Sequence, residues 1–368
     1  MDNMCSLTFD KVIKLKKELL GNYNYNFIFK KQITDLMSNR KTIAYLDLLK
    51  NTDGIFPTDL LSMLSEKEKT QIDFSLKCKK SFINNNHSIY DELPPPHLAN
   101  FEWRYSRDCI EKIVNQIEKN KYICCLGTPT IAIELIYRGY PNITLLDINE
   151  PIINTIKTGF RNKNPNCRAY NVLDNLPEEL KSCFDMVIID PPWYLDYYEL
   201  FLFRSIQLIN ATNGNILLPI FPVLSHRSAC FDLIYLYNYI LESGAKNLRN
   251  CGYVEYDMPE FEKLIILENK IPIPDNNWRC AELINIEYDN TSFALNNIVP
   301  PKINDFIYWD RKYNPKDKNY YVANTHHLFP LKSEYVLCCE QMMSISRKNF
   351  SRKKIVAWDN KNRIIVAK

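Results

Sequence analysis

The sequence of 368 residues is poor in several residue types that common active sites need. It holds only 8 glycines and 5 histidines, which disfavours glycine-rich phosphate loops and chemistry that depends on several histidines. Its 12 cysteines include no C-x-x-C spacing, so a zinc knuckle or a thioredoxin-type site has no support. G-x-S-x-G, H-E-x-x-H and P-loop motifs are also missing, which argues against hydrolases, zinc proteases and nucleotide kinases. We predict no metal site.

Long hydrophobic runs are absent too. The longest, Ile216 to Leu224, is interrupted by two prolines, whereas a membrane helix needs about 20 apolar residues. Met1 to Cys5 has no basic stretch leading into an apolar segment, so we expect a cytoplasmic protein with reduced cysteines. The 46% of hydrophobic residues are typical of a packed soluble protein. A net charge of +3 neither requires nor excludes a nucleic-acid partner.

Two proline clusters, Pro94-Pro95-Pro96 and Pro300-Pro301, divide the chain. They predict an N-terminal domain over residues 1–92, a central domain over 93–298 and a C-terminal extension over 299–368. The N-terminal part has short helical patterns, which suit a winged-helix module or any small helical cap. Both interpretations remain open.

The C-terminal extension is rich in aromatic and basic residues. Ile355 to Trp358 and Arg363 to Val366 are apolar runs that predict strands. The eight basic residues between Arg347 and Lys368 suit either a nucleic-acid surface or a solvated charged face.

The central domain alternates between apolar runs of strand length and helical patterns. Such alternation predicts a doubly wound parallel α/β sheet of the Rossmann-like kind, covered by helices on both faces. The expected strands are Tyr122–Leu126, Ile143–Asp147, Arg168–Asn171, Met186–Ile189 and Asn215–Leu218.

Ligands of such sheets bind at the carboxyl ends of the strands. Gly127 follows the first strand and permits a tight turn. Thr128 is a suitable N-cap and Pro129 a suitable first residue for the next helix, whose free N–H groups would face an anion. Asp147 ends the second strand, where a carboxylate can accept bonds from both ribose hydroxyls of an adenosine cofactor. The alternative for Asp147 is an ordinary helix cap.

Asp174, just after the third strand, could accept a bond from an adenine amino group. It also fits a simple turn.

The strongest local signal is Asp190-Pro191-Pro192-Trp193 at the end of the fourth strand. Prolines stiffen the turn and leave their carbonyls free to accept hydrogen bonds. Asp190 and a proline carbonyl can orient an amine toward an electrophile, and Trp193 offers a face to a base or a cation. We therefore predict a catalytic role for this segment.

This segment resembles the Asp-Pro-Pro-aromatic signature of class I S-adenosylmethionine-dependent methyltransferases that modify exocyclic amines. The resemblance covers about Tyr122 to Leu218. It implies that Gly127, Thr128, Asp147 and Asp174 hold the cofactor and that Asp190 and Trp193 hold the acceptor, an amine that a nucleic acid could carry. The usual cofactor loop of this family has two or three glycines, and here only Gly127 remains.

A longer resemblance points to the branched-chain polyamine synthases. It rests on Tyr90-Asp91-Glu92-Leu93-Pro94, on Pro177–Leu180 and on Asp190 through Arg204. That resemblance implies aminopropyl transfer from decarboxylated S-adenosylmethionine. The acids that follow the glycine in that family are replaced here by Thr128-Pro129-Thr130, which favours methyl transfer. A third hypothesis, which the glycine-poor loop permits, is a binding protein without catalysis.

Overall fold

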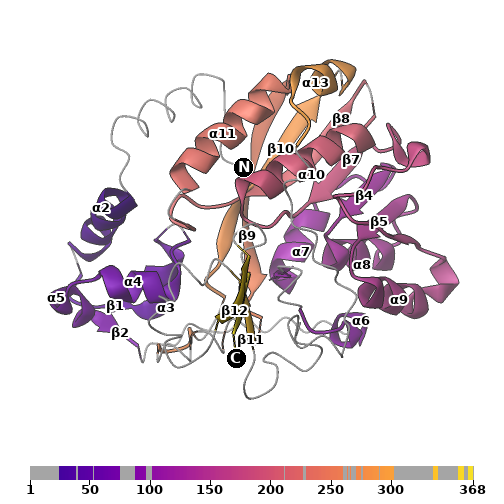
Figure 1. The fold of residues 1–368 in the computed structure, drawn as a ribbon. Helices are drawn as coiled ribbons and strands as arrows, with labels where there is room; N and C mark the ends of the chain where they lie inside the picture. The colour runs from indigo at the N-terminus through magenta and orange to yellow at the C-terminus, as the bar shows by residue number, and fades with distance from the viewer. Residues whose placement is uncertain are drawn as a thin grey trace.

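The computed structural model describes most of the chain between residues 25 and 301 (Figure 1). The described residues are 25–38, 40–52, 54–74, 88–96, 102–210, 212–226, 229–259, 263, 266, 271–274, 277–289 and 291–301, with three short strands of the C-terminal extension.

An eight-stranded sheet forms the centre of the molecule, in the order β3-β9-β10-β8-β7-β4-β5-β6. The five strands from β8 to β6 are parallel, while β10 runs antiparallel to both β8 and β9, and β3 antiparallel to β9. The strands are β3 (Arg104–Tyr105), β4 (Ile123–Leu126), β5 (Ile143–Asp147), β6 (Asn166–Ala169), β7 (Met186–Ile189), β8 (Gly214–Ile220), β9 (Asn247–Asp257) and β10 (Cys280–Tyr288).

Helices cover both faces of this sheet, α7, α8 and α9 on one face and α10, α11 and α13 on the other (Figure 1). They are α6 (Ser88–Glu92), α7 (Arg107–Val114), α8 (Pro129–Tyr137), α9 (Glu150–Gly159), α10 (Leu195–Leu208), α11 (Ala229–Glu242) and α13 (Thr291–Asn297).

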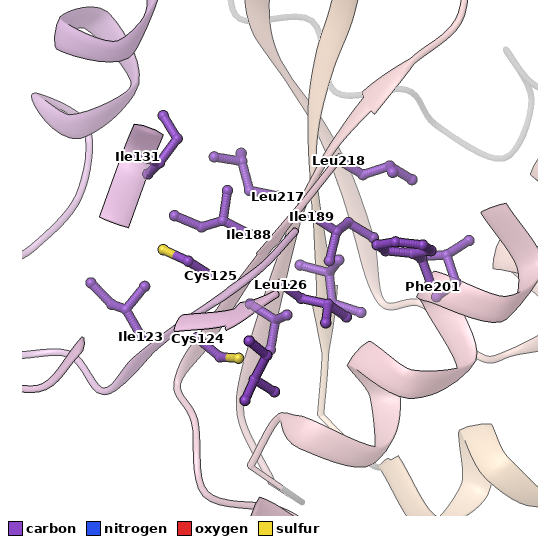
Figure 2. Packing of buried hydrophobic residues seen from close by; sticks show 14 of the residues in the cluster. Ile123, Cys124, Cys125, Leu126, Ile131, Ile188, Ile189, Phe201, Leu217 and Leu218 are labelled. Carbon is purple, nitrogen blue, oxygen red and sulfur yellow. The ribbon is translucent and has the colours of Figure 1, made fainter. Parts of the chain in front are cut away.

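The central strands are buried on both faces, which explains their continuous apolar sequences. Figure 2 shows Cys125 and Ile188 on the side of Ile131 from α8, and Ile189 on the side of Phe201 from α10. Neighbouring residues of a strand thus pack against helices on opposite faces of the sheet. The doubly wound α/β prediction is confirmed, and so are the central strands, although β6 begins two residues earlier than expected.

The N-terminal part is helical, as predicted, with a small core of its own. In α2 the residues Tyr25, Phe29, Ile33 and Met37 recur at every fourth position and are all buried. The elements are α2 (Tyr25–Met37), β1 (Ile43–Ala44), α3 (Tyr45–Lys50), α4 (Pro57–Met63), α5 (Glu66–Lys69) and β2 (Ile72–Asp73), with β1 parallel to β2.

This N-terminal part packs on the central domain beside the end of β8 and the β9–β10 edge. The Tyr25 hydroxyl donates to the Leu224 carbonyl at 3.3 Å, and Lys50 pairs with Glu255 of β9 at 3.0 Å. Trp278, just before β10, is buried within the N-terminal core.

In the C-terminal extension, β11 (Tyr335–Cys338), β13 (Ile364–Ala367) and β12 (Ile355–Asp359) form an antiparallel sheet in that order. The strand predictions for the two apolar runs are confirmed. The basic segment from Arg347 to Lys354 lies outside the described residues. Among the helices that the structure describes, none has the length and apolar character to cross a membrane.

Candidate active site

A cleft opens at the carboxyl ends of β4, β5 and β7. In the sheet β4 lies between β5 and β7, so the strand order reverses at β4. Its walls also include residues 102–105, Tyr256 of β9 and Arg279 before β10. The empty space, counted to its open mouth, is about 1160 Å³.

The turn after β4 shapes the floor of the cleft. Gly127 has a φ of +69° and donates its N–H to the Leu146 carbonyl at 2.8 Å. A Cβ built on Gly127 would lie 3.4 Å from the ring of Phe201. That distance is an ordinary van der Waals contact, so this position favours glycine because of its backbone conformation.

Thr128 occupies the N-cap position of α8, as predicted, but its side chain does not cap the helix. Its buried hydroxyl instead donates to the Ile188 carbonyl of β7 at 3.2 Å, and no side-chain cap bond forms. Thr128 thereby ties the β4 turn to the strand that delivers Asp190. Pro129 occupies the first turn of α8, as predicted.

Asp147 ends β5, lines the cleft and is only 7% exposed. One of its oxygens accepts the Asn149 N–H at 2.8 Å. The Asn149 side chain, in turn, donates to Glu102 at 3.0 Å. The cation of Arg104 interacts electrostatically with Asp147 and Glu102. This side of the cleft thus combines two carboxylates with one partly buried guanidinium.

The loop after β6 forms the opposite wall, where residues 170–173 line the cleft. Asp174 does not line it, and the backbone carbonyl of Asp174 accepts the Tyr170 hydroxyl at 3.1 Å. The predicted contact of Asp174 with adenine has no geometric support, and Asn171 is the polar side chain of this loop that lines the cleft. Arg204 of α10 holds the loop by donating to the Val172 carbonyl at 3.0 Å.

Asp190 lies beyond the end of β7 and lines the same cleft as Gly127 and Asp147. The Tyr256 hydroxyl donates to its carboxylate at 2.8 Å, and Tyr105 makes a second hydrogen bond to it. Burial raises the pKa of the Asp190 carboxyl to about 7, against the lowering effects of both tyrosines and of the Arg279 charge. Near neutral pH this carboxyl can therefore accept a proton.

The two prolines are not equivalent. The Pro192 carbonyl accepts the Tyr194 N–H at 2.7 Å and so closes the turn. Among the hydrogen bonds of the described residues, none is accepted by the Pro191 carbonyl. This carbonyl is therefore a candidate acceptor for an amine N–H.

Of the two predicted partners of Trp193, a base or a cation, the structure places a cation on its ring. Trp193 is only 4% exposed, and the guanidinium of Arg279 lies 3.8 Å from its ring centroid. Tyr256 packs against it edge-on, with 5.8 Å between the ring centroids. The protein itself therefore fills the space in which we expected a base.

Four residues of this site escaped the sequence analysis: Trp103, Tyr105, Tyr256 and Arg279. They come from β3, β9 and the segment before β10, which carry no motif and were not predicted as strands. Pairing of Tyr105 with Tyr256 across β3 and β9 brings both hydroxyl groups to Asp190. In the part of the chain that the structure describes, no group of three or more metal-ligating side chains occurs.

Residues 100–219 match the model of a family described as probable N6-adenine methyltransferase. The central domain is thus similar to S-adenosylmethionine-dependent methyltransferases. The matched segment runs from β3 into β8 and contains the carboxyl ends of β4, β5 and β7, whereas Tyr256 and Arg279 lie outside it.

The fold is also similar to solved structures of the branched-chain polyamine synthase from Thermus thermophilus. One of them, in complex with N4-aminopropylspermidine and 5'-methylthioadenosine, has a TM-score of 0.56 at 10% identity, over 77% of this chain and 94% of that chain. The C9 mutein of that enzyme, with the same ligands, has a TM-score of 0.57 at 10% identity, over 76% and 91%. At this identity the likeness concerns the fold. No curated protein matches the sequence.

Proposed function

We propose that the protein transfers a methyl group from S-adenosylmethionine to an exocyclic amine, with adenine of a nucleic acid as the acceptor. The observation that carries this proposal is Asp190, a half-buried carboxylate followed by two prolines, in one cleft with Gly127 and Asp147. The family described as probable N6-adenine methyltransferase supports the choice of acceptor.

The residues of the cleft suit an adenosyl cofactor. Asp147 would accept the ribose hydroxyls with its remaining lone pairs, and Gly127 would allow the cofactor to approach the turn after β4. Asn171 would bind the adenine edge, and the N-terminus of α8 would face the carboxylate of the cofactor. When bound, S-adenosylmethionine would supply an electrophilic methyl group.

On the acceptor side, Asp190 would accept one N–H of the amine and the Pro191 carbonyl the other. Two such bonds would turn the nitrogen lone pair toward the cofactor, and positioning of this kind accounts for most of the rate enhancement in a displacement reaction. Because its pKa lies near 7, Asp190 can also accept the proton that the amine releases.

Aminopropyl transfer is the second candidate, because the fold similarity extends over almost the whole branched-chain polyamine synthase. A decarboxylated cofactor carries a primary ammonium in place of the amino-acid group. Residues 127–130, at the N-terminus of α8, offer that ammonium no carboxylate. The free N–H groups of a helix N-terminus favour the complete cofactor, with its carboxylate.

Calorimetric titration with S-adenosylmethionine and with its decarboxylated form tests this choice. We expect S-adenosylmethionine to bind at least about tenfold more tightly, a difference of about 1.4 kcal/mol. Tighter binding of the decarboxylated form would support aminopropyl transfer. Binding of neither would support the hypothesis of a protein without catalysis.

A further inference from the structure

Arg279 is held between two tryptophan rings inside the cleft. Its guanidinium carbon lies 3.8 Å from the ring centroid of Trp193 and 4.4 Å from that of Trp103. The residue is only 5% exposed, and it lines the cleft together with Asp190. Its charge acts on the Asp190 carboxyl.

The backbone and the neighbouring aromatic rings fix this arrangement. The Arg279 carbonyl accepts the Tyr256 N–H at 3.0 Å, which places Arg279 beside the tyrosine that bonds to Asp190. Trp103 packs edge-on against Trp278 at 6.3 Å, and Trp278 packs edge-on against Phe56 of the N-terminal part at 5.7 Å. The N-terminal core therefore packs, through Trp278, against one of the two rings that hold Arg279.

Aromatic rings around a carboxylate form a recognition site for organic cations, because the ring faces attract positive charge. In this cleft the protein's own guanidinium already occupies that site. A protonated polyamine that approached Asp190 would meet a buried positive charge instead of an open aromatic cage. An acceptor with negative charge would gain from the same cation, since guanidinium groups bind phosphate strongly.

We propose that Arg279 is a specificity-determining residue that rejects polycationic amines and selects an amine carried by a nucleic acid. This inference rests on the proposed function and narrows its acceptor class. Arg279 neutralises charge near the reacting amine, and the rings of Trp103 and Trp193 hold it in place. The same device accounts for the burial of Trp193, which a stacking platform for a base would not require.

The test compares two ligands, a single-stranded oligonucleotide that contains adenine and spermidine, by titration at one fixed salt concentration. The full chain is used as wild type and as Arg279→Met, which removes the charge but keeps much of the volume. We expect the wild type to bind the oligonucleotide and not spermidine. The variant should lose about tenfold in oligonucleotide affinity, as expected for loss of one desolvated cation, and should bind spermidine measurably.

Two further variants keep the test decisive. Arg249→Met removes an equal charge from an exposed position on β9, so both affinities should stay within about twofold of wild type. Arg279→Lys keeps the charge and should still reject spermidine, which decides the question if the methionine variant fails to fold.

Spermidine binding by the wild type or by Arg279→Lys would overturn the proposal. So would an Arg279→Met protein that is folded and has both affinities unchanged. A parallel titration with S-adenosylhomocysteine separates this result from the proposed function. If the wild type fails to bind that compound, the cofactor assignment is wrong, whereas the oligonucleotide and spermidine affinities still report on Arg279.

Discussion

The hydroxyl of Tyr256 donates a hydrogen bond of 2.8 Å to the carboxylate of Asp190, across the gap between β9 and the loop after β7. This bond stabilises the charged form of a carboxyl whose pKa burial raises to about 7. Tyr256 is thus a positioning residue that keeps part of the Asp190 population ionised at neutral pH.

Tyr256→Phe should shift the pH dependence of the reaction. Without the donated bond the pKa of Asp190 rises further, so turnover at pH 7 should fall by about three- to tenfold and recover toward wild type near pH 9. The measurement is the pH profile of methyl transfer. Tyr239→Phe is the matched control, because the buried Tyr239 hydroxyl has no hydrogen-bond partner within the described chain. A profile that falls equally at every pH would contradict the assignment.

Asp190→Asn should abolish most of the turnover and yet stabilise the fold at high pH. The folded carboxyl has a pKa of about 7 and the unfolded one about 4, so the native state binds more protons between these values. Wild-type stability should therefore decline as pH rises from 4 to 7, on the order of 1–3 kcal/mol more than in the variant. Urea unfolding at pH 5 and pH 8 measures this difference. Parallel pH dependence in the two proteins would rule out an elevated pKa.

Asp147→Ala should weaken cofactor binding by about 1–3 kcal/mol, through the loss of hydrogen bonds to a charged acceptor. Calorimetric titration with S-adenosylhomocysteine checks this value. Asp174→Ala is the control, because Asp174 does not line the cleft, and its affinity should match wild type. An unaffected Asp147 variant would reduce this residue to a turn cap, the role in which it already accepts the Asn149 N–H.

Gly127→Ala should damage both the fold and the cofactor site. A side chain at a φ of +69° costs about 1–2 kcal/mol, and the new methyl group would contact Phe201 and narrow the cleft. Gly139→Ala meets similar strain at a φ of +76°, with no atom within 4 Å of the new methyl group. We expect the two variants to lose similar amounts of thermal stability. Only Gly127→Ala should also lose cofactor affinity. Equal cofactor affinities would mean that the turn after β4 does not touch the cofactor.

The central strands were predictable from sequence because burial on both faces leaves continuous apolar runs such as Ile123–Leu126. Asp147 and Asp190 were predictable as cleft residues for a related reason, since each ends such a run. Thr128 was also predicted at the cleft, which it lines, but its hydrogen bond was not predictable. The Thr128 side chain bonds to the distant Ile188 carbonyl instead of capping α8, and no local pattern reveals such a bond.

The site residues that the sequence analysis missed lie toward the antiparallel edge of the sheet. β9 contains polar residues such as Asn250 and Glu255 among its apolar ones, so it lacks the continuous run by which the central strands were found. Tyr256 reaches Asp190, 66 residues earlier in the chain, only after β9, β10 and β8 have paired. The position of Arg279 depends in addition on the ring of Trp103, a residue far earlier in the chain.

Transfer of a labelled methyl group from S-adenosylmethionine to a single-stranded, adenine-containing nucleic acid tests the central claim most directly. After digestion to nucleosides, mass spectrometry should detect methylated adenine with the wild type and a yield lower by orders of magnitude with Asp190→Asn, which still binds the cofactor. An aminopropylated amine formed from the decarboxylated cofactor, or full methylation by Asp190→Asn, would contradict the account.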